Sequence, residues 1–185
     1  MERSILLFLA AYNDFWNAID GQPEEEFMLD DEPEPIENIT RIVVEGGSKD
    51  ARLRWPISFQ AFARWLPMLA ARSNCELTEL DDETRNLLDK HLGDKSRGFY
   101  WEDLPYVDDV TRNEDFHHWE FLNVQGPAGR VSYLISCSPE DAGTVVRMDR
   151  SGGDGGVNEC ESPEAWLQRT TDQLKHFTRE RRDMA

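Results

Sequence analysis

The stretch from Trp119 to Leu174 constrains the fold of this chain more than any other part of the sequence. Two runs rich in β-branched and aromatic residues, 120–124 and 130–136, are separated by a short connection that contains two glycines and a proline, which predicts a hairpin. A second turn cluster at 138–143 places a proline where φ is preset and a glycine where φ becomes positive. Residues 144–149 are therefore expected to return as a third antiparallel strand.

A helix is predicted to follow these strands. Ser162, Pro163 and Glu164 supply an N-cap, a first-turn proline and a first-turn carboxylate. The helix is expected to continue to about Arg181. One face is marked by residues at three- and four-residue steps: Trp166, Leu167, Thr170, Leu174 and Phe177.

Three earlier segments also have helical patterns. Apolar residues recur from 5 to 19, with Ser4 as the expected cap. A second pattern begins after Ser58, where Pro67 is expected to kink the helix or to begin a new one. The third pattern spans 83–92, follows two aspartates that suit a helix N-terminus, and ends at a glycine.

The length of 185 residues fits one domain with a core that needs no disulfide or metal. The three cysteines are an odd number without paired spacing, which favours a reducing compartment. Segments 39–45 and 51–55 read as short strands and predict a second hairpin. The expected fold is α+β: a single domain, 1–185, with a mostly antiparallel sheet flanked by N-terminal, central and C-terminal helices.

The formal net charge of -17 is the most unusual bulk property of the chain. Such a charge repels phosphate backbones and anionic lipid surfaces, so direct binding of nucleic acid or of membrane is not expected. Basic partners would instead be steered toward the protein. The alternative is that the acidity only maintains solubility or reflects a salt-rich cytoplasm.

The apolar run at 5–11 is the strongest near the N-terminus, but it is much shorter than the ~20 residues of a membrane span. It continues into Tyr12, Asn13 and Asp14 rather than into a small-residue cleavage site, which does not fit a signal peptide. The cytoplasm is therefore the expected location.

Residues 20–38 form an acidic, proline-containing segment with nine carboxylates and no Lys or Arg. This composition predicts a loop. Two interpretations remain open, a solvated connection and an acidic docking arm.

A second segment, 99–109, interleaves aromatic residues with carboxylates, which is typical of the anchors and rim of a protein interface. A buried aromatic corner is the alternative. The candidate partner-binding residues are Trp101, Tyr106, Asp108, Asp109, Glu114 and Asp115, with Asp149 and Asp154 as further candidates.

Catalytic and metal-binding patterns are weak. His117 and His118 are adjacent, and adjacent residues of a strand point to opposite faces, so one is expected to face inward. His91 and His176 lie in predicted helices without a recognised metal-ligand frame. The loop at 149–156 lacks the spacing of a calcium site. No catalytic residue, metal or cofactor is predicted.

The order of a strand, a turn, Gly143-Thr-Val-Val146, a short loop and then 157–167 resembles the C-terminal half of the SUKH superfamily. Members of that superfamily typically place a Ser-x-x-x-Trp/Phe-Leu helix after an antiparallel sheet, and Ser162, Trp166 and Leu167 match this pattern. The resemblance covers about a third of the chain.

The resemblance implies an α+β fold with one sheet flanked by helices. It also implies a bacterial immunity protein that binds and neutralises a secreted toxin, often a nuclease. The acidic charge points in the same direction, because carboxylates can take the place of phosphates in a basic cleft. The expected function is stoichiometric inhibition of a basic toxin without turnover; the alternatives are a carboxylate-rich hydrolase and an intracellular adaptor without a toxin partner.

Overall fold

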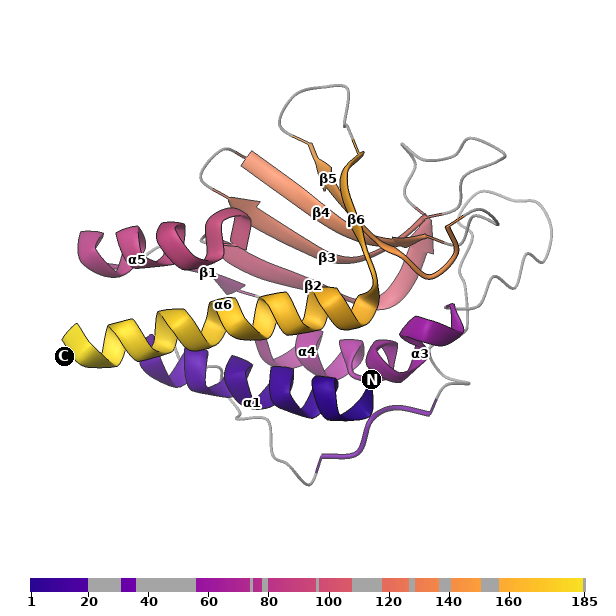
Figure 1. Ribbon diagram of the computed structural model, residues 1–185, viewed down its shortest axis with the longest axis horizontal. Helices are drawn as coiled ribbons and strands as arrows, with labels where there is room; N and C mark the ends of the chain where they lie inside the picture. Colours follow the sequence, from indigo (N-terminus) through magenta and orange to yellow (C-terminus); the bar gives the residue numbers. More distant parts are fainter. Residues whose placement is uncertain are drawn as a thin grey trace.

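The computed structural model of the protein describes residues 1–19, 31–35, 56–73, 75–77, 80–95, 97–107, 118–126, 129–136, 141–150 and 157–184. These residues form a single α+β domain in which an antiparallel sheet carries a layer of helices on one side (Figure 1). The predicted fold class is confirmed. The expected hairpin of 39–45 and 51–55 lies outside the described residues, as does most of the acidic segment at 20–38.

The sheet is a meander whose spatial order follows the sequence, and each neighbouring pair is antiparallel. Gly126 pairs with Gly129 at the turn of the predicted hairpin, and the third predicted strand pairs with the second. The described strands are β1 (Cys75–Glu76), β2 (Gly98–Val107), β3 (His118–Gly126), β4 (Gly129–Ser136), β5 (Val145–Asp149) and β6 (Val157–Glu161).

The described helices are α1 (Glu2–Ala18), α3 (Ile57–Ala63), α4 (Leu66–Ser73), α5 (Asp82–Leu92) and α6 (Pro163–Met184), with the short 3-10 turn η1 (Gly93–Lys95) after α5. In Figure 1, α1, α3, α4 and α6 lie on the same side of the sheet, and α5 lies beyond the end of the sheet at which β1 is placed.

Two predicted caps are wrong. Helix α1 begins one turn earlier than expected, with Met1 in the cap position, and the hydroxyl of Ser4 donates to a carboxylate oxygen of Glu164 at 3.3 Å. Helix α3 has Pro56 in its cap position, and Ser58 instead donates to the carbonyl oxygen of Gly143. In both cases a hydroxyl that could cap its own helix is used for a contact between distant segments.

Other helix boundaries follow the sequence. Helix α3 ends before Pro67, and Pro67 is the second residue of α4. Of the two expected outcomes, a kink and a new helix, the structure therefore shows the new helix. Asp81 caps α5 by accepting the backbone N–H of Thr84 at 2.7 Å. This hydrogen bond, with a second one from the Thr84 hydroxyl, lowers the pKa of the Asp81 carboxyl.

Helices α1 and α6 lie side by side and run in the same direction (Figure 1). The N-terminal ammonium group contacts Glu164 in the first turn of α6 at 3.1 Å, and Arg182 near the end of α6 contacts Asp14 at 3.2 Å. These exposed pairs fix the register of the two helices, while buried apolar area supplies most of the stability.

The core between helices and sheet is aromatic. Trp166 of α6 is fully buried, and its ring contacts Phe8 of α1, Phe62 of α3 and Phe121 of β3. Leu167 is 1% exposed. The two residues that resemble the SUKH helix pattern are therefore core residues, as expected.

None of the helices in the described ranges is both long enough and apolar enough to cross a bilayer.

Candidate functional site

Trp101 is a core residue, so the prediction that it is an exposed partner anchor is wrong. Its side chain is 2% exposed, and its indole nitrogen donates to the hydroxyl of Tyr12 at 2.9 Å. Alternation along β2 places Phe99 and Trp101 on the same face, and both contact aromatic rings of α1. The alternative, a buried aromatic corner, is correct for these two residues.

The other predicted contact residues do not form one described patch. Tyr106 lies in β2 with its backbone opposite Glu120, and Asp149 ends β5 opposite Val131. Strands β3 and β4 separate them. The remaining candidates lie outside the described residues: Asp108, Asp109, Glu114, Asp115 and Asp154.

A buried carboxylate on β3 is the centre of a polar network that sequence patterns did not identify. Glu120 is fully buried, and its two oxygens accept hydrogen bonds from Arg150 at 2.7 Å and from Arg130 at 3.3 Å. Arg150 is 19% exposed and Arg130 is 54% exposed. A buried carboxylate needs such cationic partners, because an unpaired charge would be strongly destabilising there.

The network continues across the sheet through neutral side chains. Ser132 accepts from Arg150 at 2.6 Å and donates to Asn123 at 2.9 Å. Asn123 also accepts from Arg130 at 2.7 Å and donates to Glu102 at 3.3 Å. Because matched donors and acceptors link β2, β3, β4 and Arg150, the residue after β5, we interpret the network as a set of contacts that fixes strand register rather than as a reactive centre.

Lys95 is a second buried charge that sequence patterns did not identify. It is 1% exposed, it donates to the hydroxyl of Thr170 at 2.9 Å, and its ammonium lies 5.0 Å from the ring centroid of Tyr133 and 5.2 Å from that of Trp166. Contacts with ring faces partly replace the lost hydration of the cation. Lys95 therefore ties η1 to both the sheet and α6.

The clearest candidate for a binding site is the acidic strap, which we define as residues 31–35. The strap lies against α3 and α4 and is held at both ends by arginines. Arg64 donates to the carbonyl oxygens of Glu34 at 2.7 Å and of Pro33 at 3.3 Å, and it accepts at its own carbonyl from the Glu34 N–H at 3.0 Å. Arg72 pairs with the carboxylate of Asp31.

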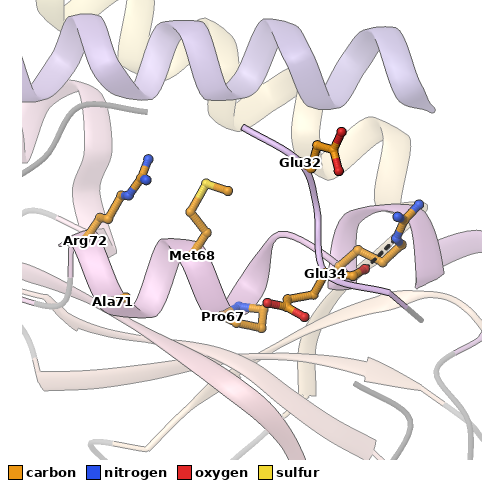
Figure 2. A pocket seen from close by; sticks show the side chains of 7 residues that line it. Glu32, Glu34, Pro67, Met68, Ala71 and Arg72 are labelled. Carbon is orange, nitrogen blue, oxygen red and sulfur yellow. Dashed lines mark hydrogen bonds between the residues drawn. The ribbon is translucent and has the colours of Figure 1, made fainter. Parts of the chain in front are cut away.

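Between the strap and α4 lies a cavity of about 460 Å³, which we call the strap cavity (Figure 2). Met68 and Arg72 project from α4 beside it, and Glu32 and Glu34 extend from the strap. Its lining residues are Glu32, Glu34, Arg64, Pro67, Met68, Ala71 and Arg72. The volume lies within the range of about 300–1,000 Å³ that is usual for ligand sites.

The strap cavity combines charge with an apolar floor. Glu32 and Glu34 are exposed, whereas Pro67 and Met68 are half-buried. Such a surface suits a basic side chain whose aliphatic stem packs on apolar atoms while its charged end meets carboxylates. The sequence identified the acidic segment as a possible docking arm. No sequence motif marks Arg64 and Arg72, the two arginines that hold the strap, as its partners.

The described histidines do not assemble a metal site with acidic residues. In that part of the chain no group of three or more His, Cys, Asp or Glu side chains has a geometry that could hold a metal ion. His91 stacks on His176 at a centroid distance of 6.2 Å and contacts Glu180 at 2.7 Å, and hydrogen bonds from Lys90 and His91 lower the pKa of Glu180. His118 is buried, whereas His117 lies outside the described residues.

No protein-family model, curated protein or solved structure matches this chain.

Proposed function

We propose that this protein is a cytoplasmic immunity protein that binds a basic protein toxin stoichiometrically and blocks it without turnover. The observation that carries the proposal is the fixed acidic strap on a chain with a net charge of -17. Arg64 holds the strap through backbone carbonyl oxygens, so it anchors the segment without using a carboxylate. The strap thus presents exposed Glu32 and Glu34 from an ordered backbone.

Ordering the strap in advance favours binding. A free acidic loop loses conformational entropy when a partner fixes it, and this loss weakens the complex. Here the hydrogen bonds of Arg64 and the ion pair of Arg72 have already fixed five residues. The remaining free energy of binding can then come from contact between carboxylates and a basic cleft.

The toxin class is supported by the charge and by the resemblance of the C-terminal segment. An enzyme that acts on nucleic acid needs a basic cleft, and carboxylates can occupy the positions of phosphates. Segment 157–167 resembles the SUKH superfamily, and its pattern residues Trp166 and Leu167 belong to the core. Both observations support an inhibitor of a basic nuclease.

The proposal is tested by capture with matched charge variants. Immobilised wild-type protein, the strap variant Glu32→Gln/Glu34→Gln and the control Glu2→Gln/Asp172→Asn are incubated with extract from the native cell at low ionic strength. The control removes the same charge from exposed positions on α1 and α6. We expect one basic protein to be retained by wild type and control and to be lost, or at least tenfold weakened, with the strap variant.

The retained protein is then purified and its toxicity is measured with increasing amounts of the wild-type chain. Saturation at one chain per toxin molecule, with loss of toxicity, is the expected result. A retained protein whose activity is unchanged at saturation would identify an adaptor rather than an inhibitor. Equal retention by all three baits would show that net charge, and not the strap, determines capture.

A second variant tests whether the acidic residues before Trp119 also contribute to binding of the toxin. Reversal of charge at Asp108 and Asp109 to Lys is expected to slow association with a basic toxin by weakening electrostatic steering. Unchanged association rate and affinity for this variant would exclude that segment from the binding surface.

A further inference from the structure

A separate surface hollow lies where the C-terminal parts of α1 and α6 meet. It has a volume of about 280 Å³. Its lining residues are Asp14, Lys175, Thr178, Arg179, Arg182 and Asp183. Thr178, Arg179 and Arg182 follow Lys175 by three, four and seven residues, so the four residues share one face of α6. We call this site the C-terminal hollow.

The cations of the hollow differ in how far they are already paired. Arg182 contacts Asp14 at 3.2 Å, which neutralises that carboxylate and joins the two helices. Arg179 donates to the Nδ1 atom of the exposed His176 at 2.9 Å and, among the described residues, has no ion pair with a carboxylate. Lys175 is exposed and, in the described part of the chain, has no hydrogen bond or ion pair. Two cations are thus available in a protein whose net charge is strongly negative.

Basic residues near a helix C-terminus also stabilise the helix by interaction with its dipole. The helix dipole accounts for the basic residues at this end of α6, but it does not account for the buried hydroxyl of Thr178. This side chain is 4% exposed, and its hydroxyl has no hydrogen-bond partner within the described ranges. The hydroxyl of a threonine inside a helix commonly donates a hydrogen bond to the carbonyl oxygen four residues earlier. A buried hydroxyl without this bond is destabilising unless another acceptor occupies the site.

We propose that the C-terminal hollow binds a phosphate-type oxyanion. Its oxygens would accept hydrogen bonds from Arg179 and Lys175 and, after a small side-chain shift, from the hydroxyl of Thr178. Phosphate suits this donor set because several oxygens accept at once and because a guanidinium can bind two of them. The Asp183 carboxylate at the same hollow disfavours long polyanions, so the ligand is a single phosphoryl group, free or carried by a small molecule. This site does not depend on the strap or on the proposed toxin.

The test is titration of the whole chain with inorganic phosphate at constant ionic strength, with chloride replaced as phosphate is added. Binding is measured by calorimetry and by the midpoint of thermal unfolding. A parallel titration with a nucleoside monophosphate distinguishes free phosphate from a phosphorylated metabolite as the natural source. We expect saturable binding of at least one of these two probes.

Matched variants locate the site. Lys175→Gln/Arg179→Gln is expected to weaken binding at least tenfold, and Thr178→Val, which keeps the shape of the side chain, to weaken it severalfold. The control Arg3→Gln/Lys90→Gln changes net charge equally but lies outside the hollow, and it should bind like wild type. Equal loss in control and hollow variants, or no binding of either probe beyond that of chloride, would overturn the proposal. Because Thr178→Val removes only a hydroxyl, it provides a test even if the double variant does not fold.

Discussion

The indole nitrogen of Trp101 donates a hydrogen bond to the hydroxyl of Tyr12, 2.9 Å away in the core. The Tyr12 hydroxyl donates in turn to Ser73 at 3.0 Å, and Ser73 donates to the carbonyl oxygen of Leu69 at 2.7 Å. This chain of bonds joins β2 to α1 and α4. It explains how an aromatic residue with a polar nitrogen is accommodated away from solvent.

Replacement of Tyr12 by Phe should destabilise the protein by about 1–3 kcal/mol, because it removes the acceptor of a buried donor without changing ring packing. Denaturant unfolding of Tyr12→Phe, Trp101→Phe and the double variant measures the coupling. The double variant should lose less free energy of unfolding than the sum of the single variants. Strict additivity would show that this bond does not contribute to stability.

Gly143 is expected to tolerate alanine much less well than Gly93. Both have positive φ, 87° and 51°, which costs a side chain about 1–2 kcal/mol. At Gly143 a Cβ would also lie 2.4 Å from the Ser58 hydroxyl oxygen, whereas at Gly93 nothing lies within 4 Å. The clash adds about 1–3 kcal/mol, so Gly143→Ala should cost about 2–5 kcal/mol in all. Ser58→Ala should restore part of this loss in chemical denaturation, and equal costs at the two glycines would contradict the argument.

The two arginines that bind Glu120 should differ in their contribution to stability. Arg150→Met leaves a fully buried carboxylate without its closer cation, at a cost of about 3–5 kcal/mol. Arg130 is more than half exposed and more distant from the same carboxylate, so Arg130→Met should cost about 1–2 kcal/mol. Urea unfolding of the two variants provides the comparison. A larger loss for Arg130→Met would reverse the assigned roles.

Acidic pH should remove the contribution that the Asp81 carboxylate, the N-cap of α5, makes to the stability of the fold. The folded-state pKa of Asp81 is lowered by hydrogen bonds from Thr84, so its stabilising contribution is present above the unfolded pKa of about 3.9 and is lost as the pH falls through the folded value. Asp81→Asn should therefore be less stable than wild type at neutral pH, and the difference should shrink in acid. Unfolding curves measured from neutral to acidic pH, with Asp82→Asn as a control for charge alone, would show this. A difference that stays constant into acid would mean that the carboxylate charge is not responsible.

The strands and helices with local signals were predictable. The turn between β3 and β4, the positive φ of Gly143 and the capping of α5 by Asp81 all depend on residues close in sequence. Strand β6 could not be predicted, because Val157 to Glu161 has no run of β-branched or aromatic residues and its strand conformation depends on pairing with β5. The local sequence makes Ser4 and Ser58 suitable caps, but contacts with distant partners determine what their hydroxyls bind.

The candidate sites depended even more on contacts between distant residues. The burial of Trp101 could not be predicted from the acidic residues next to it in the sequence, because strand alternation places its side chain against α1. The attachment of the strap joins residues about 30 positions apart through Arg64 and about 40 apart through Arg72. Neither pairing follows a local spacing rule. The charge of the acidic segment was visible in the sequence, whereas its fixed position was not.

The side-by-side packing of α1 and α6 has a consequence for the order of folding. The meander from β1 to β6 pairs neighbours in sequence, so its strands can associate as they are synthesised. Part of the aromatic face of α1, at Phe8 and Phe15, is covered by Trp166 and Phe177 of α6, which follows all six described strands in the sequence. We therefore expect this part of α1 to stay uncovered until α6 has been synthesised, a period in which binding by a chaperone would protect it from aggregation.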